Sequence, residues 1–254
     1  MIDLTGRLCL STIGADCREE ALAHGLGLEI AEFCTAANLE QDYAAHLRRA
    51  RAAMAGLDCF WFHAPFAELC PAAIDPGVRR LTGQRYWQAM DTAAALGIRR
   101  VVIHGGFIPM VYFPQWFVEQ SVLFWREFLP WVPGDFTLAL ENVMEPEPSL
   151  LTEIVRQVDD PRLGLCLDVG HANTGTSKTP PLAWIDPMAP WLRHVHLHNN
   201  GGQWDTHSAL GEGTVPMEAV LERLLERCPQ VTFTIENETC APSVRWLSER
   251  GYLL

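Results

Sequence analysis

Four histidines and one aspartate crowd into fourteen residues in the last third of the sequence, at His194, His196, His198, Asp205 and His207. Imidazole nitrogens and carboxylate oxygens are common ligands of zinc and related ions. Val195 and Leu197 alternate with the first three histidines, which is typical of a strand that carries three imidazoles on one face. Such a row needs partners, because unpaired polar groups are costly to bury. The crowding therefore indicates a metal site rather than one core histidine with surface neighbours.

The elements that must position these residues are short apolar runs of strand length, which alternate along the chain with longer helical patterns. The expected strands are Leu8–Thr12, Leu28–Phe33, Cys59–His63, Val101–His104, Thr137–Glu141, Leu163–Asp168, His194–His198 and Val231–Glu236. The clearest expected helices are Tyr43–Ala55, Val78–Leu96, Pro114–Leu129, Leu150–Val158 and Met217–Arg227. The Pro-rich stretch between residues 168 and 194 has the least defined helix. Eight strands in alternation with helices predict the α/β class and one (β/α)8 TIM barrel.

The length and composition agree with one large domain over residues 1–254. The chain has 254 residues, of which 48% are hydrophobic, and it shows no repeat, low-complexity run or flexible linker. No apolar run approaches the roughly 18 residues of a membrane span, so we expect no membrane association. The N-terminus lacks a signal-peptide pattern, and the eight cysteines form no C-x-x-C pair. We therefore expect a cytoplasmic protein with reduced thiols.

The net charge of −12 argues against a broad phosphate-binding surface, because nucleic-acid binding depends on lysine and arginine to displace counterions. Nucleic acid is therefore not the expected partner, although bound cations would offset part of the charge locally. Tryptophan-rich helices are compatible with a homodimer.

Residues able to do chemistry converge on one end of the predicted barrel, where strands end and active sites form. Glu141 and Glu236 each end an apolar strand and precede an asparagine. A carboxylate there is costly unless it meets a cation, and arginine is not concentrated nearby. The other candidates at strand ends or in the following loops are His63, His104, Asp168, His171, His196, Asp205 and His207.

The order of several short segments resembles the xylose-isomerase-like TIM-barrel superfamily, which includes sugar phosphate isomerases and epimerases and endonuclease IV (AP endonuclease family 2). The matching segments cover residues 62–66, 102–106, 140–142, 167–171, 195–197, 205–213 and 235–237. Each segment is common by itself, whereas the ordered set is specific.

The resemblance implies two ligand sets. The epimerase branch implies one divalent ion held by Glu141, Asp168, His196 and Glu236. The endonuclease IV branch implies three zinc ions, the second of which shares those four residues. Its first ion would be held by His63, His104 and Glu141, and its third by His171, Asp205 and His207.

Other positions separate the branches or remain open. Phe66 and Leu69 stand where endonuclease IV has a tyrosine and an asparagine that engage DNA. Glu147 matches a substrate-contacting glutamate of ketose epimerases, but Gly202 replaces an arginine of those enzymes. Trp204 would line the pocket or pack its own loop. The apolar segment 107–116 would form a lid over a small-molecule pocket or a packed or subunit contact.

The first expectation is a metal-dependent sugar or sugar phosphate isomerase or epimerase. One ion would stabilise an enediolate, and Glu141 and Glu236 would act as a general acid/base pair. His171 would hold a substrate oxygen, with Glu147, His63 and Trp204 as further substrate contacts. Zinc suits the histidine-rich set best, and manganese, cobalt and magnesium stay open.

The alternative expectation is a di- or trinuclear zinc phosphodiesterase of the endonuclease IV type, which would act on abasic DNA or a small phosphodiester. It would use all nine candidate ligands, with Glu141 bridging two ions. A noncatalytic sugar- or metal-binding module is the third interpretation.

Overall fold

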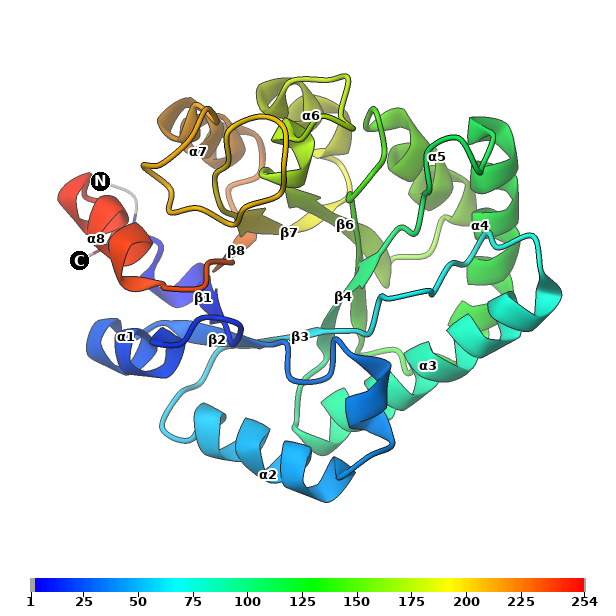
Figure 1. Cartoon of the computed structure of the whole chain (residues 1–254), viewed down its shortest axis with the longest axis horizontal. Helices are drawn as coiled ribbons and strands as arrows, with labels where there is room; N and C mark the ends of the chain where they lie inside the picture. Colours follow the sequence, from blue (N-terminus) through cyan, green and yellow to red (C-terminus); the bar gives the residue numbers. More distant parts are fainter. Residues whose placement is uncertain (1–2, 254) are drawn as a thin grey trace.

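Eight parallel strands close into a barrel in the computed structural model, which describes residues 3–253 (Figure 1). Each strand pairs with the next in sequence, and β1 pairs with β8. This confirms the predicted (β/α)8 TIM barrel. The strands are β1 Leu8–Ser11, β2 Gly27–Ile30, β3 Phe60–His63, β4 Arg100–His104, β5 Thr137–Glu141, β6 Leu163–Asp168, β7 Leu192–Leu197 and β8 Thr232–Ile235.

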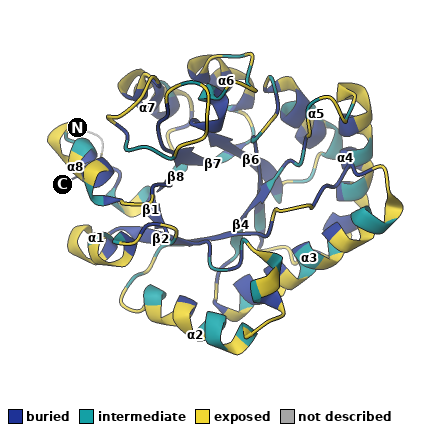
Figure 2. Ribbon diagram, in the orientation of Figure 1, coloured by how far each residue is buried: buried dark blue, intermediate teal, exposed yellow. Residues whose placement is uncertain are grey.

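Helices surround the barrel and turn their apolar sides toward it, so that burial alternates around each helix (Figure 2). In α5, for example, Leu150, Leu151, Ile154 and Val155 are buried, at the spacing of one helix face. The helices are α1 Cys17–His24, α2 Tyr43–Met54, α3 Pro76–Ala95, α4 Pro114–Phe128, α5 Ser149–Val158, α6 Pro181–Met188, α7 Met217–Arg227 and α8 Ala241–Glu249. None of the helices described is long and apolar enough to cross a membrane.

The sequence did not single out α1, α6 and α8, because each has only eight or nine residues and offers little periodicity. The expected strand Leu28–Phe33 was also too long. Phe33 is buried in the loop after β2, where its ring stacks on Phe62 with centroids 5.8 Å apart. Phe33 is thus an apolar loop residue, and its burial against the barrel explains why the sequence pattern extended the predicted strand too far.

The barrel interior contains a small apolar cluster and buried polar side chains. Side chains alternate along each strand, so Leu138 and Leu140 of β5 join the core under the helices. Ala139, on the opposite face of β5, belongs to a separate interior cluster, and Glu141 lies beyond it at the strand's end. This cluster consists of Cys9, Trp61, Val102, Ala139 and Cys166. Buried polar side chains lie at the C-terminal ends of the strands.

Candidate metal centre

Four buried side chains from neighbouring strands converge at the C-terminal end of the barrel: Glu141, Asp168, His196 and Glu236. Glu141 ends β5, Asp168 ends β6, and Glu236 directly follows β8. The Nδ1 atom of His196 lies 3.1 Å from Glu141 Oε1, 3.6 Å from Asp168 Oδ2 and 3.5 Å from Glu236 Oε2. We call these four residues the middle group.

The middle group contains three carboxylates for one imidazole. Within residues 3–253, no lysine or arginine forms an ion pair with any of the three carboxylates. Burial by itself would raise the pKa of Glu141, but His196 and the other nearby imidazoles outweigh this and hold it well below its usual range. Glu141 Oε2 is buried and accepts no hydrogen bond. Such an excess of buried anionic oxygen fits a divalent cation.

A second group adjoins the middle group through Glu141. His63 Nε2 lies 3.4 Å and His104 Nε2 lies 3.3 Å from Glu141 Oε2. Burial lowers the pKa of His63, but the Glu141 carboxylate outweighs burial and the pKa rises to about 9. Burial lowers the pKa of His104 to about 3. His63, His104 and Glu141 together could hold another ion.

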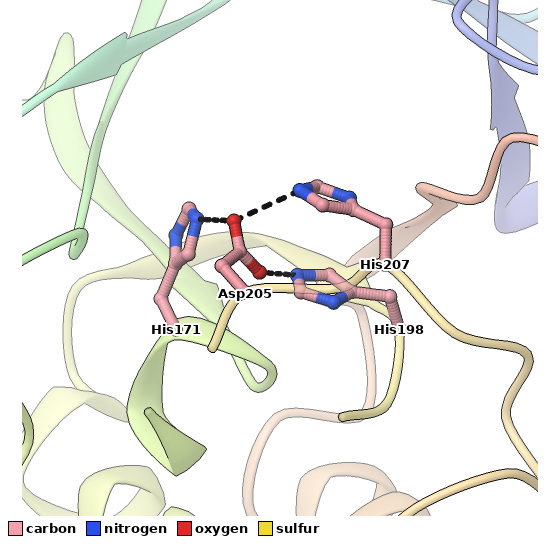
Figure 3. Close-up of side chains that lie close together, drawn as sticks. All are labelled: His171, His198, Asp205 and His207. Carbon is pink, nitrogen blue, oxygen red and sulfur yellow. Dashed lines mark hydrogen bonds and ion pairs between the residues drawn. The ribbon is translucent and has the colours of Figure 1, made fainter. Parts of the chain in front are cut away.

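An outer group surrounds one carboxylate with three imidazoles: His171, His198, Asp205 and His207 (Figure 3). Asp205 Oδ2 lies 3.1 Å from His171 Nε2 and 3.0 Å from His207 Nε2. Burial lowers the pKa of His207, but Asp205 outweighs it and raises the pKa to about 9. Asp205 is therefore paired within the outer group, whereas Glu141 and Asp168 of the middle group contact imidazoles of the neighbouring groups as well as His196.

His198 connects the outer and middle groups, and sequence reasoning did not assign it as a ligand. It directly follows β7, and its Nε2 lies 2.9 Å from Asp168 Oδ1 and 3.7 Å from Asp205 Oδ1. Its ring lies against Gly170, where a Cβ atom would stand only 1.9 Å from the ring. The strand alternation noted around His196 was the available signal, because it put His198 on the same face.

Two further buried carboxylates were missed. Glu29 of β2 lies beneath His196, and Glu145 follows β5, where its Oε2 accepts hydrogen bonds from the backbone N–H groups of Val143 and Met144. The signal for Glu29 was its place between Leu28 and Ile30 in a strand. The sequence carries no comparable signal for Glu145.

The structure does not bring two of the expected substrate contacts to the metal groups. Glu147 is exposed and accepts a hydrogen bond from the Ser149 hydroxyl outside the barrel mouth. Trp204 is 80% exposed on its loop. Both residues stand apart from the cavity described next.

A cavity of about 290 Å³ opens over the metal groups. The residues that line the cavity include no lysine or arginine. No residue of the segment 107–116 lines the cavity. Phe66 forms part of the wall and stacks on His104, with ring centroids 4.4 Å apart. The lining residues are Ile13, Ala31, Cys34, His63, Phe66, His104, Glu141, Val143, His171, Asp205, His207 and Glu236.

All nine ligands expected from the sequence thus lie in three adjoining groups at one end of the barrel. The strand ends explain this, since parallel strands of a closed barrel present their C-terminal ends to one face. The arrangement can hold one ion at the middle group and can accommodate others beside it.

Two curated relatives align with most of this chain. The chain is 31% identical over 193 residues to the uncharacterized protein MJ1311 of Methanocaldococcus jannaschii, an alignment that covers 72% of this chain and 66% of the relative. It is 24% identical over 172 residues to "Probable endonuclease 4" of Mycobacterium leprae, covering 63% of this chain and 66% of that protein. The chain thus spans just under two thirds of the length of these relatives.

Solved structures extend the likeness over nearly the whole chain. A D-tagatose 3-epimerase-like protein superposes with a TM-score of 0.78 and 26% identity, covering 97% of this chain and 96% of that one. The TTHB071 protein from Thermus thermophilus, soaked with ZnCl2, superposes with a TM-score of 0.72 and 30% identity, covering 96% of this chain and 98% of that one. Residues 20–250 match the model of one family. The chain therefore belongs to the xylose isomerase-like TIM-barrel family.

Proposed function

We propose that this protein is a divalent-metal-dependent isomerase or epimerase of a sugar or sugar phosphate. One observation carries the proposal: of the four middle-group residues, only Glu141 and Glu236 also line the cavity. Asp168 and His196 are not among the residues that line it. Glu141 and Glu236 would therefore both face a bound substrate and help to hold one ion.

Glu141 and Glu236 suit the roles of a general acid/base pair. Each follows or ends a rigid strand, and they approach His196 Nδ1 from β5 and from β8. One residue, as the carboxylate, would remove the proton next to the substrate carbonyl, and the other, as the carboxylic acid, would donate its proton to the resulting enediolate; exchange with solvent would then restore both groups. A divalent ion in the middle group would supply the Lewis acidity that makes this proton acidic.

Other cavity residues have supporting roles in this proposal. His171 and His63 line the cavity and can hydrogen-bond substrate hydroxyl groups. Ile13, Phe66 and Val143 form apolar wall, which is common in small-molecule sites. The absence of lysine and arginine from the lining favours a compact polyol over an extended polyanion. Zinc suits the histidine-rich surroundings, and manganese, cobalt or magnesium suits the three carboxylates.

The second candidate is a zinc phosphodiesterase of the endonuclease IV type. It is favoured by the two further groups that adjoin the middle group, one of which shares Glu141. Two or three ions there would supply a clamp for the oxygens of a phosphodiester. The net charge of −12 and the lining residues favour a small phosphodiester over duplex DNA in that case.

Metal content and proton exchange test the proposal together. Protein purified without chelator should contain about one ion per chain by elemental analysis. In deuterated water, the purified enzyme should exchange a carbon-bound proton of a ketose or inosose, seen by NMR as loss of one C–H signal. Two or three zinc ions per chain, with hydrolysis of a small phosphodiester or of abasic DNA and no proton exchange, would overturn it in favour of the second candidate.

A further inference from the structure

Glu29 is a fully buried carboxylate on β2, beneath the middle group and outside the cavity lining. Its partners come from β7 and β8, across the barrel interior, since β1 separates β2 from β8 in the sheet. Thr234 donates its hydroxyl to Glu29 Oε2 over 2.8 Å, and His194 Nε2 lies 3.1 Å from the same oxygen. Such a residue is too deep to contact a substrate held in the cavity.

The third partner of Glu29 is His196, the single imidazole of the middle group. His196 Nε2 is hydrogen-bonded to Glu29 Oε2 over 3.2 Å and lies 3.1 Å from Glu29 Oε1. The other ring nitrogen, Nδ1, faces Glu141, Asp168 and Glu236 at 3.1 to 3.6 Å. The two nitrogens therefore have different surroundings, one carboxylate below and three carboxylates above.

A neutral imidazole carries its proton on one nitrogen and a lone pair on the other, and only the lone pair can bind a metal. Histidine ligands in metal sites usually donate their other N–H to a carboxylate or carbonyl group, which fixes the ring and its tautomer. Within residues 3–253, the carboxylate that faces His196 Nε2 is Glu29, and no backbone carbonyl is bonded to this atom.

We infer that Glu29 is a positioning residue for the metal centre: it accepts the Nε2–H of His196 and so directs the Nδ1 lone pair to the ion. Glu29 is held in turn by Thr234 and by His194, whose ring stacks on Trp61 with centroids 4.1 Å apart. These buried residues would thus fix Glu29, and through it His196, in place for the ion. The inference rests on the middle-group ion of the proposed function, but not on the reaction.

The experiment measures zinc affinity in the purified full-length protein by competition with a chromophoric chelator, together with ions bound per chain. Glu29→Ala should weaken zinc binding about 10- to 100-fold with an unchanged number of ions. Glu29→Gln should lose less affinity, because the amide oxygen still accepts the His196 N–H. Glu145→Gln is the matched control, a buried glutamate whose side chain accepts hydrogen bonds from the backbone N–H groups of Val143 and Met144, and should bind zinc like the wild type.

Wild-type affinity in Glu29→Ala would overturn the inference, and so would the loss of a whole ion, which would make Glu29 a ligand. If neither variant folds, nitrogen NMR of histidine-labelled, zinc-loaded wild-type protein decides. It should show His196 bound through Nδ1 with a protonated Nε2, and binding through Nε2 would contradict the role. Because zinc is titrated without substrate, failure of the isomerase proposal would appear separately, as absent proton exchange.

Discussion

Glu141, Asp168 and Glu236 place three carboxylates around one imidazole, whereas Asp205 is surrounded by three imidazoles. The same residue types thus occur in different proportions in the two groups. The middle group has an excess of anionic oxygen that a divalent cation would neutralise. The outer group has internal ion pairs that satisfy Asp205 without an ion. The carboxylate-rich composition of the middle group therefore supports our proposal that an ion binds there.

Replacement of Glu236 by glutamine should separate ligation from proton transfer. The amide oxygen can still approach the ion, but an amide is not a base at neutral pH. We expect proton exchange to fall by about 10²- to 10⁴-fold while the circular dichroism spectrum and the metal content stay unchanged. Glu226→Gln, on the exposed face of α7, is the control and should keep full activity. Full activity in Glu236→Gln would remove Glu236 from the mechanism.

A double replacement, Asp205→Ala with His207→Ala, tests the outer group. If this group is an ion-pair network, the number of ions per chain should stay at about one. Elemental analysis of wild type and variant, purified side by side without chelator, measures this. A decrease of one ion per chain would show a resident outer ion and would favour the phosphodiesterase candidate.

The connection between β5 and α5 depends on a buried acid. Glu145 is 2% exposed, and its Oε2 accepts the N–H of Val143 over 2.7 Å and of Met144 over 3.1 Å. Gly105 leaves room for it, because a Cβ atom there would stand 2.5 Å from Glu145 Oε1. Burial raises the pKa of Glu145 from 4.5 to about 7. In the connection between β5 and α5, burial therefore favours the protonated form of the Glu145 carboxyl group.

Stability should consequently depend on pH through Glu145. Its pKa is higher in the folded than in the unfolded state, so its favourable contribution is complete below about pH 4.5 and is lost as the pH rises through about 7. A shift of this size corresponds to about 3 kcal/mol. Glu145→Gln keeps an acceptor oxygen and cannot ionise, so it should gain stability relative to wild type by up to this amount between pH 5 and pH 8.

Urea unfolding of wild type and Glu145→Gln at pH 5 and at pH 8 gives the difference in their free energies of unfolding. The other titrating groups contribute equally to both proteins, so their effects cancel in this difference. Glu226→Gln, with its side chain 66% exposed, should show no such change. A difference between Glu145→Gln and wild type that is the same at both pH values would contradict the assignment.

Across the whole molecule, the candidate ligands join six of the eight strands, from His63 at the end of β3 to Glu236 after β8. An ion in the middle group would tie the ends of β5, β6 and β7 to the residue after β8. It would also remove the repulsion among three buried carboxylates. Metal binding should therefore stabilise the entire barrel, because the unfolded chain cannot assemble these ligands.

Removal of the metal with a chelator should lower the melting temperature, and zinc should restore it. Free zinc at 100 times its dissociation constant contributes about 2.7 kcal/mol. For a chain of this size, that corresponds to a shift on the order of 5–10 °C. Scanning calorimetry with and without chelator measures the effect, with Asp168→Asn as the control that should respond less. An equal melting temperature in both conditions would argue against a structural contribution of the ion.

Much of the architecture was predictable because it follows from local periodicity. Val195 and Leu197 alternate with histidines, and the apolar runs that end in Glu141 and Asp168 recur at barrel spacing. The ordered segments also led to the family. The short helices and the role of Phe33 escaped prediction, because eight-residue helices have weak patterns and an apolar loop residue resembles a strand residue.

The barrel and the strand-end positions of the candidate ligands could be predicted from the amino-acid sequence, because alternation and strand order are local properties of the chain. How those residues group, and which residues support them, could be seen only in the folded molecule. Glu29 and His196 meet across 167 positions of sequence, and Glu147 is turned outward although it lies six residues after Glu141. Such contacts depend on strand register, which fixes how far along the barrel each side chain lies. Strand register is set when the barrel closes, and no local sequence pattern encodes it.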